Sequence, residues 1–434
     1  MKQRIRNGLF VLAAVLLCAG LAACGTKAVP DVNLIQNDTE SKRYVNLFGP
    51  TEKSDPDADN IARKAHEKTV LMAEEKLGIT VEYRTYTAED YQDKTYDEVT
   101  LDRARNNMDD LYLLNPDVIQ VLGTEGKLAD LSGLTVAKNL REVVKTANTI
   151  DGKLVAIPQE VVAYGLFVNK ELFDKYKLSL PNTPEEFLNC CKVFQENGID
   201  TPVGANRWWL ETFVFAQAYA ELYNEEDTDA RIRELNSGEA KYSDYMRESF
   251  EFLKVLIEEG YIDAEKAYVS EALEGERDDF LTEKCPIVMA YWGAANADTA
   301  YGNPGFDMQV IGFPSSLGQM PVFTITGYGI SSDAKHMEEA MAVLDEILSE
   351  EALSAYAETN QVISPSEHVE VECIDALKPL NKRINEGIYV LASNANMKME
   401  QWGNVCLAVR ELLNGASVDD CMAELDRLQK EAIK

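Results

Sequence analysis

The sequence predicts an α/β protein with more than one lobe, and three observations carry this prediction. The chain has 434 residues, which is long for a single hydrophobic core. A strand, a helix and a second strand follow one another between residues 44 and 83. Further along, residues 151–173 contain two strands joined by a short extended segment. Such a segment suits a crossing of the chain between two lobes.

The first strand, residues 44–48, has the sequence Tyr-Val-Asn-Leu-Phe. Residues 59–77 place apolar side chains at helical spacing, and Gly78 is a suitable C-terminal stop. Residues 79–83 then form the second strand. A strand–helix–strand order implies a parallel pair of strands with a right-handed crossover.

A third strand is predicted for residues 110–115, followed by a helix that starts at Pro116. Asn115 is expected to cap this helix. Asp117 falls in its first turn, where a carboxylate is stabilised by the helix dipole. A ligand-binding role and a purely helix-stabilising role are both open for Asp117.

The central stretch begins with the turn dipeptide Asp151–Gly152. Residues 154–157 are predicted to form a buried strand that Pro158 closes, and residues 164–168 form the next strand. Asn169 can cap the helix that follows.

The remaining chain is predicted to be mainly helical. Residues 183–196 form a helix with a capping box at its start. Trp208 and Trp209 are adjacent and therefore point in different directions, so at most one of them is expected to lie in the core. Helices are also expected at residues 212–222 and at the C-terminus, where Ser417 caps the last one.

The N-terminal segment favours an exported protein, and the charge of the chain limits its partners. Residues 1–23 have basic residues and then an apolar run too short to span a bilayer, as in a signal peptide. The formal net charge is −32, and removal of Lys2, Arg4 and Arg6 with this segment makes it −35. Such a charge disfavours binding to nucleic acid and to anionic membrane surfaces.

The cysteines do not form a metal-binding or disulfide framework. No pair has C-x-x-C spacing, and the chain has only 3 histidines, so a zinc site is poorly supported. No cofactor or metal is expected. The thiols that remain after Cys18 and Cys24 are predicted to be mostly buried and free, with disulfide pairing left open: Cys190, Cys191, Cys285, Cys373, Cys406 and Cys421.

The central stretch resembles a segment of the extracellular solute-binding proteins of bacterial ABC importers, in the branch that carries sugars. The shared features are Asp-Gly-Lys at residues 151–153, Ile-Pro at 157–158 and Asn-Lys-Glu-Leu-Phe at 169–173. Residues 180–187 also fit the family pattern Pro-x-Thr-x-x-Glu. The resemblance implies a two-lobed periplasmic-binding-protein-like fold of type II, with hinge strands between the lobes and a ligand cleft between them. It also implies a monomer that delivers its ligand to permease subunits.

Residues 21–25, Leu-Ala-Ala-Cys-Gly, resemble the bacterial lipobox. This implies that Cys24 is lipidated and anchors the protein to the outer face of the cell membrane, with residues 24–41 as a flexible tether. Whether the envelope has one membrane or two stays open.

Three landmarks resemble maltose-binding proteins. Asp117 falls where those proteins bind a sugar hydroxyl with aspartate, and Trp292 and Trp402 match their sugar-stacking tryptophans. Val162 replaces a sugar-binding glutamate of that group, so maltose itself is not the expected ligand.

Sugar recognition needs flat aromatic rings for the apolar ring faces and carboxylates or amides for the hydroxyl groups. Glu52 is one carboxylate that lies near the landmarks of the family. The predicted ligand-binding residues are Trp292, Trp402, Trp208, Trp209, Asn115, Asp117, Gln159, Glu160, Tyr164, Glu211 and Tyr328.

Several functional alternatives stay open. A secreted carbohydrate-active enzyme would also combine tryptophans with paired carboxylates, although the chain has no serine elbow and no phosphate loop. A sensing or adhesion lipoprotein would share the fold. Glycerol phosphate or a polyamine is an alternative ligand, and the acidic charge would suit a cation.

The resemblance also predicts the lobe limits. Lobe 1 is expected to comprise residues 42–163 and 312–373, and lobe 2 residues 164–311 and 374–434. The chain is expected to cross between them near Ala163–Tyr164 and near Val310–Phe313.

Overall fold

The computed structural model describes residues 43–49, 61–86, 94–224, 227–270, 275–293, 304–369 and 374–434. The predicted signal peptide, the lipidation site Cys24, the tether and Glu52 lie outside these residues, as do Cys18 and Cys373.

The first sheet has four strands in the order β13-β3-β1-β2. Strand β1 pairs in parallel with β2 and β3, and β13 is antiparallel to β3. Helix α1 lies between β1 and β2 in the chain, which confirms the predicted strand–helix–strand unit with a parallel pair. The strands are β1 (Tyr44–Gly49), β2 (Thr80–Thr85), β3 (Leu111–Leu114) and β13 (Gly327–Ile330), and the helix is α1 (Ile61–Leu77).

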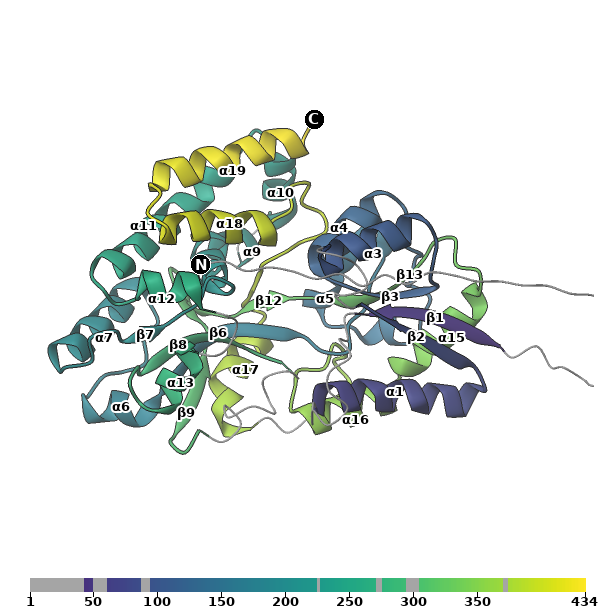
Figure 1. The fold of residues 1–434 in the computed structure, drawn as a ribbon, viewed down its shortest axis with the longest axis horizontal. Coiled ribbons are helices and arrows are strands. Elements are labelled where there is room, and N and C mark those ends of the chain that lie inside the picture. The colour runs from purple at the N-terminus through teal and green to yellow at the C-terminus, as the bar shows by residue number, and fades with distance from the viewer. Residues whose placement is uncertain are drawn as a thin grey trace, which may run out of the picture. The chain divides into compact units, whose positions relative to one another are not determined.

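Helices cover both faces of the first sheet because successive side chains of a strand point in opposite directions. Leu47 of β1 packs in the cluster that contains residues of α1 and α15, whereas its neighbour Phe48 packs with residues of α3 and α4. Helix α1 also packs against α16 (Figure 1). The further helices of this part are α3 (Tyr96–Arg105), α4 (Pro116–Thr124), η1 (Val136–Asn139), α5 (Glu142–Asn148), α15 (Met337–Ile347) and α16 (Glu350–Asn360).

The second sheet is organised around the long strand β6, which is buried over most of its length. The strand order is β14-β12-β6-β8-β7, and β9 also pairs with β6. Strands β8, β9 and β12 are antiparallel to β6. The strands are β6 (Val162–Asn169), β7 (Val203–Gly204), β8 (Ile287–Trp292), β9 (Met308–Ile311), β12 (Val322–Thr324) and β14 (Val390–Leu391).

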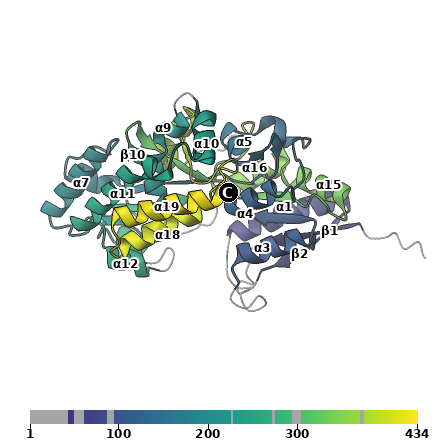
Figure 2. The same ribbon diagram turned by 90° about the horizontal axis from the view of Figure 1, so that it is seen from above.

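Helix α8 packs on the second sheet, and α11, α18 and α19 pack with it in a helical layer. Helices α18 and α19 lie side by side in both views, with α11 beside α19 (Figures 1 and 2). The helices of this part are α6 (Lys170–Lys175), α7 (Pro184–Glu196), α8 (Leu210–Ala218), α9 (Ala220–Asn224), α10 (Thr228–Ser237), α11 (Tyr242–Glu258), α12 (Ala264–Val269), α13 (Gly275–Leu281), η3 (Asp375–Leu377), α17 (Lys378–Asn385), α18 (Trp402–Leu413) and α19 (Val418–Ala432).

Local sequence signals set several of these boundaries. The side chains of Asn169, Thr183 and Ser417 each accept a hydrogen bond from a backbone amide in the first turn of the following helix, as predicted. The reciprocal half of the predicted capping box is absent, because Glu186 accepts from the amide of Asn182 and not from that of Thr183. Asp151 and Gly152 both have positive φ and form the tight turn between β4 (Thr149–Ile150) and β5 (Lys153–Leu154). The predicted strand at residues 154–157 is only partly present, because β5 ends at Leu154.

In the described residues the chain passes between the two sheets three times: before β6, between β12 and β13, and again before β14. Ile157 still pairs with Tyr328 of the first sheet, and β6 begins five residues later in the second, close to the predicted crossing at Ala163. The return lies between β12 and β13 and not at the predicted Val310–Phe313, because β9 pairs with β6 and stays in the second sheet. The hairpin of β10 (Phe313–Ser315) and β11 (Gly318–Met320) also precedes the return. The exact lobe limits stay a prediction.

Candidate functional site

Four aromatic side chains from separate parts of the chain meet beside the second sheet. Trp209 and Tyr291 are stacked, with ring centroids 5.1 Å apart and an interplanar angle of 12°. Tyr164 lies 5.3 Å from Tyr291, 6.4 Å from Trp209 and 5.5 Å from Trp402. We call Tyr164, Trp209, Tyr291 and Trp402 the aromatic wall.

Strand register and two helix starts bring these rings together. Tyr164 of β6 is the direct cross-strand partner of Tyr291 of β8, and cross-strand pairs lie on one face of a sheet. Trp209 is the N-cap residue of α8, and Trp402 is the first residue of α18. Because α8 packs against α18, both helix starts reach the same end of the second sheet.

The wall has a buried and an accessible part. Tyr164 and Trp209 are 9% and 7% exposed, whereas Tyr291 and Trp402 are half-buried. In the described part of the chain, Nε1 of Trp209 has no hydrogen-bond partner. The accessible rings offer flat apolar surface, and the buried rings hold them in place.

Three carboxyl groups lie near the start of α18, and we call Asp97, Asp117 and Glu400 the carboxylate row. Asp117 accepts hydrogen bonds from Ser393 Oγ at 3.2 Å and from the backbone amide of Gly403 at 3.3 Å. Asp97 accepts a hydrogen bond of 2.8 Å from Asn115 Nδ2. Asp117 and Asp97 are half-buried, and Glu400 is exposed.

The carboxylate row is electrostatically strained. Burial raises the pKa of Asp117 well above its ordinary value, and the nearby charge and hydrogen bond of Glu400 raise it further. Burial also raises the pKa of Asp97, with a smaller contribution from Glu400, while the hydrogen bond from Asn115 opposes the increase. Because these carboxyl groups repel one another when they are ionised, binding of a proton or another cation is favourable at the carboxylate row.

The carboxylate row also connects the two sheets. Asp117 belongs to α4 beside the first sheet, whereas Gly403 belongs to α18 beside the second. Gln120 Nε2, one turn further along α4, donates to the carbonyl groups of Met397 and Lys398 at 3.0 and 3.2 Å. The segment that leads to Trp402 is thus bound to the end of β3 and the start of α4.

Glu160 lies at another side of the aromatic wall. It is half-buried, and its Oε1 accepts a hydrogen bond of 3.5 Å from Tyr356 Oη. Burial raises the pKa of Tyr291 to about 12, and the charge of Glu160 contributes to this increase. Glu160 is therefore close enough to act together with the wall.

Asn115 was expected to cap α4 and to bind ligand, and Glu211 was expected to bind ligand, but the structure places their side chains differently. Asn115 occupies the N-cap position of α4, but its side chain makes no capping hydrogen bond and donates to Asp97 instead. Glu211 is 0% exposed, and burial raises the pKa of its carboxyl group well above the ordinary value. It lies behind the wall, where its charge contributes to the raised pKa of Tyr164.

Trp292 does not lie with the aromatic wall, and its part in ligand binding stays a prediction. It is 1% exposed, its ring packs 6.1 Å from that of Phe167, and its Nε1 donates to the carbonyl of Gln361 at 2.8 Å. Because Tyr291 and Trp292 are neighbours on β8, they point to opposite faces of the sheet, and only Tyr291 reaches the aromatic wall.

Gln159 and Tyr328 are also placed in the interior, 7% and 1% exposed. Tyr328 Oη donates to Gln159 Oε1 at 3.1 Å, and Gln159 Nε2 donates to Thr69 Oγ1 at 2.8 Å. In this structure, their polar groups bind one another and join the central stretch to β13 and α1. These contacts are structural, and a ligand-binding role for Gln159 and Tyr328 stays a prediction.

Trp208 is 39% exposed and is not part of the wall. The guanidinium carbons of Arg207 and Arg410 lie 4.9 and 5.8 Å from its ring centroid. The prediction that Trp208 and Trp209 point in different directions is confirmed, and Trp209 is the one that enters the aromatic wall.

The sequence analysis missed Tyr291 and Glu400. The alternation of β8 was a usable signal for Tyr291, since it is the neighbour of a residue that was predicted to face the ligand. Glu400 precedes α18 in an irregular segment, where no periodic pattern indicates a direction.

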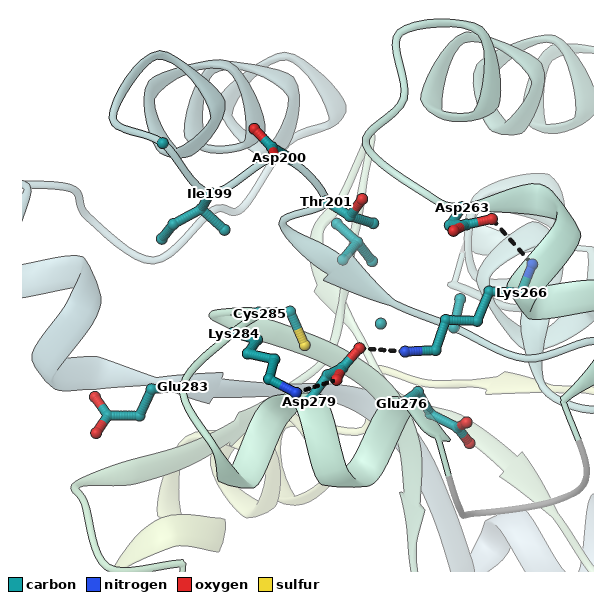
Figure 3. A pocket seen from close by; sticks show the side chains of 14 residues that line it. Ile199, Asp200, Thr201, Asp263, Lys266, Glu276, Asp279, Glu283, Lys284 and Cys285 are labelled. Carbon is teal, nitrogen blue, oxygen red and sulfur yellow. Dashed lines mark hydrogen bonds and ion pairs between the residues drawn. The ribbon is translucent and has the colours of Figure 1, made fainter.

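A separate surface cavity of about 450 Å³ lies between the loop after α7 and helix α13 (Figure 3). Its charged groups already meet one another: Lys266 forms an ion pair with Asp279, and Lys284 Nζ lies 3.4 Å from the same carboxylate. Glu276 accepts hydrogen bonds from Asn206 and Ser270. The aromatic wall is therefore the better candidate site.

Within the described residues, no group of His, Cys, Asp and Glu side chains is arranged to hold a metal ion. The five cysteines described are free thiols and buried: Cys190, Cys191, Cys285, Cys406 and Cys421. None of the helices described is both long enough and apolar enough to cross a membrane.

Comparison with solved structures shows a shared fold. The chain is similar to RafE from Streptococcus pneumoniae, with a TM-score of 0.68 and 17% identity over 91% of this chain and 99% of that one. A chitin oligosaccharide binding protein gives a TM-score of 0.71 and 18% identity over 90% and 98%. An ABC substrate-binding protein from Listeria monocytogenes in complex with cycloalternan gives 0.67 and 16% over 90% and 99%.

No curated protein sequence matches the chain. The family model of the bacterial extracellular solute-binding proteins matches residues 58–353, more than half of the chain. This match agrees with the two-lobed α/β fold. The chain therefore belongs to the family of bacterial extracellular solute-binding proteins.

Proposed function

We propose that the protein captures an oligosaccharide outside the cell and delivers it to the permease subunits of an ABC importer. The single observation that carries the choice of ligand is the aromatic wall, in which two partly accessible rings are supported by two buried ones. Flat rings suit the apolar C–H face of a pyranose, and neighbouring carboxyl groups suit its hydroxyl groups. The similar structures bind or are named for sugars, which supports the same ligand class.

We propose that ligand binding draws the lobes together. Hydrogen bonds from Ser393 and Gly403 to Asp117 already join the start of α4 to the segment that carries Trp402. A ligand held between the aromatic wall and the carboxylate row would add contacts to both sides, and a ligand favours the arrangement to which it binds better.

Calorimetric titration with a panel of neutral and charged oligosaccharides tests this function. We expect saturable binding of at least one oligosaccharide, recovery of that ligand intact, and weaker binding by Trp402→Ala. Binding of only peptides, phosphate esters or polyamines would contradict an oligosaccharide function. Hydrolysis of the bound oligosaccharide would favour the alternative of a secreted enzyme.

We also propose that Cys24 anchors the protein to the outer face of the cell membrane and that residues 24–41 tether it there. The lipobox-like residues 21–25 and the membership of an extracellular family support this location. Cys24→Ser is expected to remain in the aqueous phase of a detergent partition and to leave the cell surface. Equal partition of the variant and the wild type would count against the anchor.

A further inference from the structure

The carboxylate row has no cationic partner of its own. In the described part of the chain, no lysine or arginine forms an ion pair with Asp97, Asp117 or Glu400. Asp109 shows the usual alternative, since Arg103 binds both of its carboxylate oxygens at 2.7 and 2.8 Å. Arg207 and Arg410 are near the site, but they lie over Trp208, outside the aromatic wall.

The start of α4 compensates only part of this negative charge. The helix dipole favours one anion at Asp117, but Glu400 approaches from the segment before α18. The backbone of residue 403 fixes this approach: a Cβ atom at Gly403 would lie 3.0 Å from Glu400 Oε1 and 3.8 Å from Asp117 Oδ2. Glycine thus leaves room for two carboxyl groups beside the amide that binds Asp117.

A second observation comes from behind the aromatic wall. Glu211 is fully buried, and neither of its carboxylate oxygens has a hydrogen-bond partner in the part of the chain that is described. Burial raises the pKa of its carboxyl group well above the ordinary value, which favours the uncharged form beside Tyr164. On another side of the wall, Glu160 lies near Tyr291.

An ammonium group matches this combination. Aromatic faces attract cations through their quadrupole, and carboxylates form charge-assisted hydrogen bonds with N⁺–H donors. The formal net charge of −32 attracts a cationic ligand from a distance. We propose that the oligosaccharide carries protonated amino groups, as in a glucosamine oligomer, with an ammonium on Asp117 and Glu400 and a sugar face on the aromatic wall. This inference rests on the oligosaccharide function proposed above.

Binding of an ammonium group should displace a proton. Without ligand, the raised pKa of Asp117 favours its protonated form beside Glu400. Asp97 on the α3 side interacts with Glu400 and also opposes a second negative charge at this pair. When the ammonium binds, both carboxyl groups can ionise, and the proton passes to the solvent.

The test uses calorimetry on the full-length protein with three β-1,4-linked tetrasaccharides that differ only at C2: glucose, N-acetylglucosamine and glucosamine units. Neutral maltotetraose and raffinose complete the set. We expect the glucosamine oligomer to bind about tenfold or more tightly than the other two β-1,4-linked oligomers, the scale of a hydrogen bond to a charged group. Its binding heat at mildly acidic pH, where the amines are already protonated before binding, should depend on the buffer in the way that reports proton release.

The outcomes separate the two proposals. Equal or tighter binding of any neutral oligosaccharide overturns the inference and leaves the oligosaccharide function intact. Absence of binding to every saccharide in the set overturns both proposals.

Matched variants test the role of the carboxyl group. Asp117→Asn keeps the shape of the side chain and should reduce the preference for the amine at least about tenfold, with loss of the proton release. Glu185→Gln removes an exposed carboxylate from the start of α7 and should leave the preference unchanged. If Asp117→Asn and Glu185→Gln give the same preference as the wild type, Asp117 does not bind the amine and the inference fails.

Discussion

Two regions around the end of β8 differ in what their aromatic side chains do. Tyr291 joins the aromatic wall, whereas Trp292, the next residue, packs against Phe167 in the interior. The two environments are one residue apart because successive residues of a strand face opposite sides of a sheet. A landmark in the sequence therefore locates a site to within a residue or two. The alternation of side chains along the strand then decides which of the neighbouring residues enters the site.

Trp292→Ala should give the largest effect and should act on stability. Removal of a buried tryptophan leaves a cavity, and large-to-small changes of this kind cost about 3–5 kcal/mol. Chemical denaturation should show this loss in the free energy of unfolding, while the folded fraction still binds ligand. A variant as stable as the wild type would contradict a role for Trp292 in stability. A variant that folds but fails to bind ligand would give Trp292 a role in binding.

Trp402→Ala should act on binding. Loss of a partly accessible ring that stacks on the ligand should cost roughly 1–3 kcal/mol, or about 5- to 150-fold in Kd. Calorimetry measures the change, and thermal unfolding provides the control, since only a small shift in Tm is expected. If the affinity stays unchanged while Tm falls strongly, Trp402 belongs with Trp292 and not with the wall.

Tyr328→Phe tests whether the buried hydrogen bonds among Tyr328, Gln159 and Thr69 serve stability and not ligand binding. It removes the hydroxyl that donates to Gln159 Oε1 and should cost about 0.5–1.5 kcal/mol of stability. Ligand affinity should not change, because both side chains are buried away from the wall. A loss of affinity at unchanged stability would return Tyr328 and Gln159 to the list of binding residues.

Asp117→Asn should have an effect on stability that depends on pH. Below the ordinary aspartate pKa of 3.8, both side chains are uncharged and the two proteins should have equal Tm. As the pH rises, the unfolded wild type ionises first while the folded state keeps its proton, so the wild type loses stability relative to the variant. The difference should grow until the raised pKa is passed. A difference in Tm between the two proteins that is constant from pH 4 to pH 9 would contradict a raised pKa for Asp117.

The fold was largely predictable because its signals are local and continuous. Turn, cap and strand patterns around Asp151 and Asn169 placed the central strand, and the α/β class followed from the order of elements. The return between the sheets was predicted too early, because β9 has the same apolar pattern whichever sheet it joins. Only the pairing with β6 distinguishes the two cases, and pairing between distant strands leaves no local signal.

The candidate site was less predictable for the same reason. Trp209, Trp402 and Tyr164 were selected as rings near landmarks, and the structure brings them together. Gln159 and Tyr328 were selected in the same way, yet they bind one another in the interior. Sequence shows which side chains have suitable chemistry, but burial by distant segments decides which of them a ligand can reach.

The late return of the chain to its first sheet has a consequence for biosynthesis. Strand β3 is completed only by β13, and the adjoining contact between Asp110 and His336 joins residues 226 positions apart. Long-range pairings of this kind form slowly, and here the second partner must first be synthesised. The first sheet therefore stays without its fourth strand until most of the chain has been synthesised.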